Sequence, residues 1–172
     1  MRIVIQRCVK ASVEVAGETV GSIGQGLMAL IGIERNDTWI ECEYCLRRLI
    51  NGRYFDADPV LSEATRASGT REQVATKAWA KSVKDMDLEI LIVSQFTLYG
   101  RLTKGSKPDF HKAMKAPQSE EMFNKCVQWV KDNYKPEKVQ TGAFGRYMQV
   151  SLTNDGPVTI VLEQSAPEES TP

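Results

Sequence analysis

Two short runs of almost uninterrupted apolar residues limit the possible folds of this chain most strongly. They are residues 27–33, with the sequence LMALIGI, and residues 88–93, with the sequence LEILIV. A strand covered on both faces is apolar along its whole length, whereas a strand with one solvent-exposed face alternates. The first run therefore suits a strand covered on both faces, and the second is expected to be a central strand of a sheet.

The segments around these runs carry the period of two that is typical of half-buried strands. Apolar side chains alternate in residues 13–15, and the turn-forming residues 16–18 lead into a second hairpin arm at 19–23. The same alternation returns in residues 148–152 and 158–162, on either side of an expected turn. Strands are thus expected at both ends of the chain.

Two other stretches have helical spacing. Asn36 or Asp37 can cap a helix that runs to about residue 50, and residues 117–134 form a second helix. The order of strands, helix, strand, helix and strands predicts an α+β fold with mainly antiparallel pairing and two main helices packed against the sheets. Residues 57–76 are rich in Ser, Thr, Ala and charge, and are expected to form a long loop.

Length and charge exclude several classes of function. The chain has 172 residues, which suggests a single domain at 1–164 before a polar, disordered tail at 165–172. Its 22 basic and 22 acidic residues exclude a histone-like protein that holds nucleic acid by bulk charge. The longest uncharged stretch has 15 residues, which is too short for a membrane span. With no visible secretory signal, a cytoplasmic protein with reduced thiols is expected.

The four cysteines and the single histidine do not form the sequence pattern of a metal site or of a catalytic triad. Cys42-x-x-Cys45 has the spacing of half a zinc site, but Cys8, Cys126 and His111 supply no matching second pair. Both cysteines of the motif also fit the apolar stripe of the first helix, where free thiols behave as small hydrophobes. A Ser-His-Asp or Cys-His triad would have to include His111, which lies in a loop-like segment. Neither a metal site nor a triad is expected.

Three polar features remain as candidates for a site. Residues 101–115 carry five basic residues against one acidic residue, which suits either phosphate contact or a solvated face. Ser94-Gln95 ends the apolar strand, where freed backbone N–H groups could bind an anionic oxygen or simply cap the strand. Residues 154–157, with the sequence NDGP, first suggest a hairpin turn, although Pro157 cannot donate to the ladder. The Gly-Pro bond is trans by default, and a cis bond would make a stiff projecting tip.

Two of these segments together resemble a known family. Residues 94–98 match the Ser-Gln-x-x-Leu motif of the D-aminoacyl-tRNA deacylases, and residues 154–159 match their Asn-x-Gly-Pro-x-Thr motif. The similarity covers most of the chain, apart from an insertion at about 57–76 relative to typical bacterial members. It includes further strings in the family's order: Ile5-Gln6-Arg7, Val20-Gly21-Ser22-Ile23-Gly24, Lys107-Pro108-Asp109-Phe110, Thr141-Gly142-x-Phe144-Gly145 and Met148-Gln149-Val150.

The resemblance implies an activity and an assembly. Such enzymes hydrolyse the ester that links a D-amino acid, or glycine, to the 3′-terminal adenosine of tRNA, and they use no cofactor or metal. It also implies barrel-like, layered sheets and a homodimer with the site at the interface. There, a cis Gly156-Pro157 tip enters the partner's pocket and rejects L side chains by shape.

The resemblance also implies roles for single residues. Ser94, Gln95, Phe96 and Thr97 would line the catalytic pocket, with backbone N–H groups near Phe96 and Thr97 facing the developing oxyanion. For the chemical step, the expectation favours assistance by the 2′-OH of the terminal ribose over Thr97 as the nucleophile, because a threonine hydroxyl needs a nearby base.

Further residues would act around that pocket. Arg7 would brace the Gly156-Pro157 tip, and Phe144 would form a wall for the adenosine or pack in the core. Lys104 and Lys107 are the candidate tRNA contacts. Three alternatives stay open: a related deacylase that clears L-alanine mischarged on tRNA, a non-catalytic RNA-binding module that uses residues 101–115, and a zinc hydrolase. The related deacylase has Pro-Gln in place of Ser94-Gln95, which favours the D-specific branch.

Overall fold

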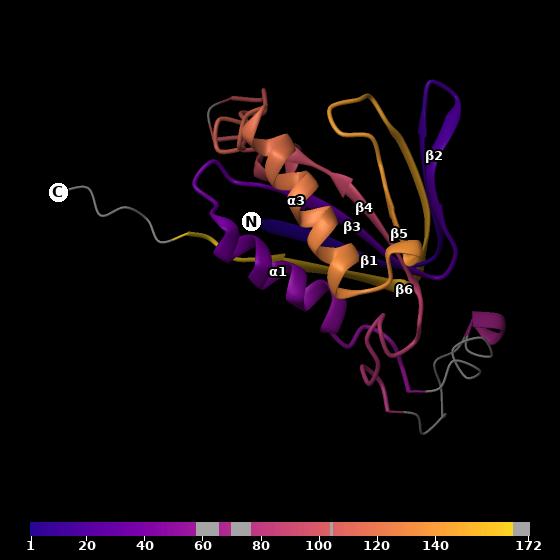
Figure 1. Cartoon of the computed structure of the whole chain (residues 1–172). Coiled ribbons are helices and arrows are strands. Elements are labelled where there is room, and N and C mark those ends of the chain that lie inside the picture. The colour runs from indigo at the N-terminus through magenta and orange to yellow at the C-terminus, as the bar shows by residue number, and fades with distance from the viewer. Residues whose placement is uncertain (58–65, 70–76, 104, 167–172) are drawn as a thin grey trace.

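The structure of the chain is a computed structural model that describes residues 1–57, 66–69, 77–103 and 105–166. Two helices lie side by side on one face of a curved sheet (Figure 1). The strands are β1 (Arg2–Val15), β2 (Glu18–Ile23), β3 (Gly26–Gly32), β4 (Glu89–Ser94), β5 (Val139–Thr141) and β6 (Gln149–Glu163). The helices are α1 (Trp39–Asn51) and α3 (Gln118–Asn133), with the short 3₁₀ turns η1 (Phe96–Tyr99) and η2 (Pro136–Lys138).

The sheet has the order β2-β1-β3-β4-β5, and β6 also pairs with β1. Pairings of β1 with β2, β3 and β6 are antiparallel, whereas β3–β4 and β4–β5 are parallel. The sheet curls until β2 reaches β5, so that a Cβ placed on Gly21 would lie 2.4 Å from the Thr141 carbonyl oxygen. The α+β, barrel-like fold is therefore confirmed, while the two parallel pairs were not anticipated.

The apolar runs serve two cores, one on each side of the sheet. The larger core lies between the sheet and the two helices, and includes Ile3, Leu27 and Ile92. The smaller core lies inside the curl of the sheet, and includes Val13 and Leu91. Since β3 and β4 contribute to both cores, their uninterrupted apolar sequences are explained.

The predicted cap of the first helix is wrong. Thr38 is the N-cap: its hydroxyl accepts from the Ile40 N–H, while the Glu41 carboxylate accepts from the Thr38 N–H at 2.8 Å. Asp37 is engaged elsewhere, because its buried carboxylate accepts from the amino group of Met1 and the Glu34 N–H. A capping box therefore starts α1 two residues after the expected position of Asn36.

The hairpin turn predicted at 154–157 is also wrong. Residues 149–163 form one strand that runs antiparallel to β1 on both sides of this sequence. Gln6 pairs with Thr159 and Cys8 with Asn154, so four residues of β6 lie opposite the single residue Arg7. The Asp-Gly-Pro sequence is thus a large bulge that projects from a continuous strand rather than a chain reversal.

Two sequence predictions fall largely outside the described residues. The insertion at 57–76 is described only at residue 57 and at 66–69, and of the tail only residues 165 and 166 are described. The domain boundary at 164 stays a prediction. In the described ranges, no helix is both long and apolar enough to cross a membrane.

Candidate active site

A cavity of about 240 Å³ opens where β4 ends. The chain leaves β4 at Ser94 and turns directly into η1, and the Gln95 N–H donates to the Ile31 carbonyl at 2.7 Å. This turn lies tightly on β3, because a Cβ on Gly32 would lie 3.0 Å from the Leu98 Cβ. The lining residues are Ile31, Ile33, Ser94, Gln95, Phe96, Met114, Ala116, Ser119, Phe123, Phe144 and Gly145.

Aromatic rings form two walls of this cavity. Phe144, from the link between β5 and β6, contacts Phe123 of α3 with 5.5 Å between ring centroids. On the other wall, Phe96 meets Phe110 edge-on, with 5.1 Å between centroids, and remains 57% exposed. Such a space suits a flat ring system with a few polar atoms at its edge.

Among the described residues, none that lines the cavity has an ionisable side chain. Thr97, predicted to lie in the pocket, does not line it; its hydroxyl accepts a hydrogen bond from the Gln95 side-chain amide. Phe96 and Thr97 are the first two residues of η1, where backbone N–H groups have no acceptor within the turn. Main-chain donors and neutral side chains are therefore the polar groups that this cavity can offer.

A second cavity, of about 370 Å³, lies at the bulge of β6. The Gly156-Pro157 peptide bond is cis, and both residues are exposed. Gly156 has φ +132°, and a Cβ there would lie 2.8 Å from Val158 Cγ2 and 3.1 Å from Arg7 Nη2. Both the backbone conformation and the crowding therefore require glycine at position 156.

Side chains on both sides hold the bulge in place. Asn154 accepts from the Val158 N–H at 2.7 Å, which closes the bulge across its base. Arg7, only 9% exposed, donates through Nε to the Asp155 carbonyl at 3.0 Å and through Nη1 to the Tyr54 carbonyl at 2.9 Å. The guanidinium therefore links β6 to the segment after α1.

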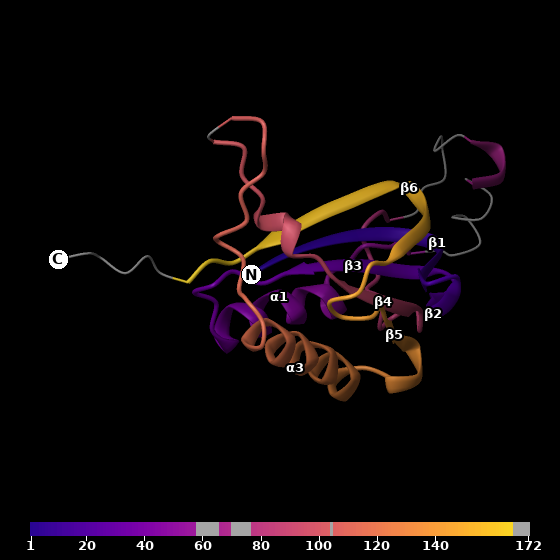
Figure 2. The same cartoon turned by 90° about the horizontal axis from the view of Figure 1, so that it is seen from above.

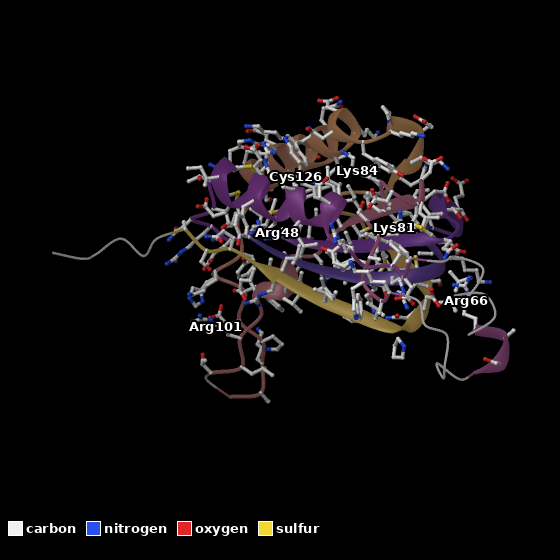
Figure 3. The ribbon with its side chains drawn as sticks, turned by 90° about the horizontal axis from the view of Figure 1, so that it is seen from below. Arg48, Arg66, Lys81, Lys84, Arg101 and Cys126 are labelled. Carbon is white, nitrogen blue, oxygen red and sulfur yellow. The ribbon has the colours of Figure 1, made fainter. Side chains whose placement is uncertain are left out.

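Asp155 and Arg66 belong to this region but were not predicted. The Asp155 carboxylate, 8% exposed, lies 3.5 Å from Arg7 Nε and 3.0 Å from Arg66 Nη1. Figure 3 shows Arg66 beside β6. A carboxylate in the middle of a strand, next to Gly-Pro, was the available signal for Asp155. Nothing in the sequence indicated which insertion residue would reach it.

The predicted residues thus fall into two groups within one chain. Ser94, Gln95, Phe96 and Phe144 surround the first cavity, whereas Arg7, Gly156 and Pro157 line the second.

The remaining candidates lie apart from both groups. Lys107 is exposed on an arm, described at residues 101–103 and 105–112, that projects from the sheet (Figure 2). Lys104 lies outside the described residues.

The metal and triad candidates find no support in the described ranges. Cys42, Cys45 and Cys126 are buried thiols, and no group of three or more His, Cys, Asp or Glu there could hold a metal ion. Burial raises the pKa of Cys45 to about 11, and a hydrogen bond with Cys42 together with burial raises the pKa of Cys126. His111 is 58% exposed and paired with Asp109.

The fold is an α+β domain with an enzyme-like cavity. The polar side chains that line this cavity, among the described residues, are uncharged. The chain matches the family described as D-Tyr-tRNA(Tyr) deacylase over residues 4–163. It is 44% identical to human D-aminoacyl-tRNA deacylase 1 over 171 residues, covering 99% of this chain and 74% of the relative. It is 45% identical to the D-aminoacyl-tRNA deacylase of Drosophila melanogaster over 169 residues, covering 98% and 94%.

Solved structures agree with these relatives. The c-Myc DNA Unwinding Element Binding Protein is 44% identical, with a TM-score of 0.82 over 96% of this chain and 100% of that one. A structure described as a probable eukaryotic D-amino acid tRNA deacylase has a TM-score of 0.72 at 16% identity, which supports the fold. The chain therefore belongs to the D-Tyr-tRNA(Tyr) deacylase family, a family of hydrolases.

Proposed function

We propose that this enzyme hydrolyses the ester between a D-amino acid, or mischarged glycine, and the 3′-terminal adenosine of tRNA. The observation that carries the proposal is the cavity at Ser94-Gln95, which has aromatic walls and, in the described part of the chain, no ionisable lining residue. It suits an adenosine whose ester lies against main-chain donors. The activity would act as proofreading in translation, and its expected location is the cytoplasm.

The hydroxyl group that assists the attack is proposed to come from the substrate. Thr97 lies outside the cavity lining, and its hydroxyl oxygen already accepts from Gln95. The described lining residues include no base that could activate it, and His111 is paired with Asp109. The 2′-OH of the terminal ribose is adjacent to the ester and assists attack by a water molecule. The water oxygen forms the new bond to the carbonyl carbon, the bond to the ribose 3′-oxygen breaks, and that oxygen leaves with a proton from the water. Backbone N–H groups of Phe96 and Thr97 stabilise the oxyanion.

Chiral selection is proposed to come from the main chain of a second copy. Gly156 and Pro157 line a different cavity from Ser94 in the same chain, so their own tip does not complete the pocket. β6 pairs only with β1 among the described strands and exposes Val150 and Val161, which suits pairing with another copy. A rigid main-chain wall then excludes an L side chain while a D side chain points outward, and glycine passes.

The test uses mixed dimers. A Gln95→Ala chain has a damaged pocket and an intact tip, and a Pro157→Ala chain has the reverse. The two variants are mixed under conditions in which dimers exchange subunits. In each mixed dimer, one site then combines the intact pocket of the Pro157→Ala chain with the intact tip of the Gln95→Ala chain. Selective hydrolysis of D-tyrosyl-tRNA over L-tyrosyl-tRNA should then reappear. If neither the mixture nor the wild type distinguishes the two substrates, the proposal fails.

The alternatives predict other outcomes. Preferential hydrolysis of L-alanyl-tRNA would indicate the related deacylase, and tRNA binding without turnover would indicate an RNA-binding module. Loss of activity with a chelator would indicate a zinc hydrolase.

A further inference from the structure

A third cavity, of about 530 Å³, shares a wall with the proposed adenosine cavity. Met114 lines both spaces. Along the chain that follows, Lys115 and Gln118 line the third cavity, whereas Ala116 and Ser119 line the first. The two cavities therefore lie on opposite sides of one short segment, which leads from the projecting arm to α3 (Figure 2).

Backbone hydrogen bonds fix the position of this segment. The Arg35 N–H donates to the Lys112 carbonyl at 2.8 Å, and the Met114 N–H donates to the Ile33 carbonyl at 2.9 Å. Glu34 and Ala113 form a bridge between these bonds. Arg35, which follows β3, is thereby brought to the same cavity as Lys115, 80 residues later in the sequence.

The third cavity is lined by two cations, Arg35 and Lys115, that have no acidic partner among the described residues. Its lining residues are Arg35, His111, Ala113, Met114, Lys115 and Gln118, with no carboxylate among them. The two nearby basic side chains that do have acidic partners are Lys112, 3.6 Å from Glu34, and His111, paired with Asp109. Among the described residues, Arg35 and Lys115 make no ion pair.

The cavity around Arg7 differs in this respect. Asp56 and Asp155 line it together with the arginines, so its cations already have counter-charges. An anion is therefore accommodated better beside Arg35 and Lys115 than at the bulge of β6.

We propose that Arg35 and Lys115 form a subsite for the phosphodiester that joins the terminal adenosine to the rest of the RNA. This inference rests on the proposed function, because it places the adenosine in the adjacent cavity. The 5′-phosphate is the only charged group of that nucleotide, and the RNA must leave the adenosine cavity past it. Two unpaired cations in an open space against the shared wall supply its counter-charge.

The test compares two substrates that differ in this phosphate. D-tyrosyl-tRNA contains it and D-tyrosyl-adenosine lacks it. Arg35→Ala and Lys115→Ala should each lower kcat/KM for the tRNA by about fivefold to tenfold, and leave the adenosine ester within about twofold of wild type. Lys81→Ala is the matched control, since it removes the same charge from an exposed side chain outside the cavity, and it should have less than a twofold effect.

A binding measurement separates this inference from the proposed function. An uncharged RNA hairpin with a single-stranded CCA end is titrated by fluorescence anisotropy at several salt concentrations. The double variant Arg35→Ala/Lys115→Ala should weaken binding at least tenfold and reduce the salt slope by about 1. If Lys81→Ala weakens binding equally, or both esters slow equally in the Arg35 and Lys115 variants, the subsite is wrong. If the wild type hydrolyses neither ester, the proposed function fails, and the hairpin titration still decides the subsite.

Discussion

Replacement of Arg7 by methionine tests whether the guanidinium holds the projecting bulge of β6. Methionine keeps most of the buried side-chain volume but removes every donor. The change leaves two buried carbonyls, of Asp155 and Tyr54, without the donors that lie 3.0 and 2.9 Å away. The Asp155 carboxylate keeps one partner, because Arg66 Nη1 lies 3.0 Å from it.

The expected loss of stability in Arg7→Met follows from the burial of Arg7 and its partners. Removing one partner of a buried ion pair costs about 3–5 kcal/mol, and each hydrogen bond from a charged donor contributes about 1.5–3 kcal/mol. Since Arg66 remains, we expect a loss near the lower end, about 3 kcal/mol in the free energy of unfolding. For a domain of this size, that corresponds to a fall in Tm of roughly 6–12 °C.

The assay is urea denaturation of Arg7→Met beside Arg47→Met as the matched control. Arg47 pairs with Glu43 on the surface of α1, where its side chain is 63% exposed, so the control should lose no more than about 0.5 kcal/mol. Under the proposed function, Arg7→Met should also hydrolyse L-tyrosyl-tRNA at a higher rate relative to D-tyrosyl-tRNA. Equal stability of the two variants would show that the Arg7 contacts do not hold the bulge.

Four further predictions concern Thr97, Tyr99 and the buried thiols of Cys8 and Cys45. Thr97→Ala should keep most of the activity on D-tyrosyl-tRNA in a steady-state assay, whereas a 2′-deoxy terminal adenosine should abolish it; the reverse pattern would make Thr97 the nucleophile. Tyr99→Phe should raise the free energy of unfolding by about 1–2 kcal/mol, because the buried Tyr99 hydroxyl has no hydrogen-bond partner among the described residues; a loss of stability in urea would contradict this. Burial raises the pKa of Cys8 and Cys45 to about 11, so iodoacetamide should label neither thiol in the native protein at pH 8. These raised pKa values also favour the protonated thiols in the folded state, so stability should fall as the pH rises from about 9 to about 11 in a denaturation series.

The sequence was sufficient to predict the strands whose pattern of apolar residues follows from their burial. β3 and β4 lie within one residue of the predicted runs, because their side chains face a core on each side. The cap of α1 could not be decided in the same way. Asp37 and Thr38 are both good N-caps, but the Asp37 carboxylate is engaged by the Met1 amino group together with the Glu34 N–H. That choice depends on residues far apart in the chain.

The parallel strand pairs and the bulge of β6 could not be predicted from the sequence for a different reason. Helix α1 connects β3 to a strand that lies parallel to it, but the segment between α1 and β4 gave no periodic signal from which that connection could be read. At residues 154–157, the Asn-Asp-Gly-Pro sequence favours a reversal locally. Its two flanking segments nevertheless both pair with β1, and this long-range pairing overrides the turn.

The predicted site residues lie at two separate cavities, and at both of them the fold itself positions the groups that would act on the substrate. Among the described residues, no acid or base lines the first cavity, so under the proposed function hydrolysis there depends on main-chain donors and on the substrate's own hydroxyl. The Gly156-Pro157 tip, which requires glycine at one position and lies on the exposed bulge, likewise presents main chain rather than reactive groups. Main-chain atoms can only act from fixed positions, because they have no rotamers with which to adjust. The buried contacts of Arg7 with Asp155 and Tyr54, and the close approach of η1 to Gly32, supply that rigidity at the tip and at the pocket respectively. Substitutions that loosen either support should therefore reduce selectivity before they unfold the domain.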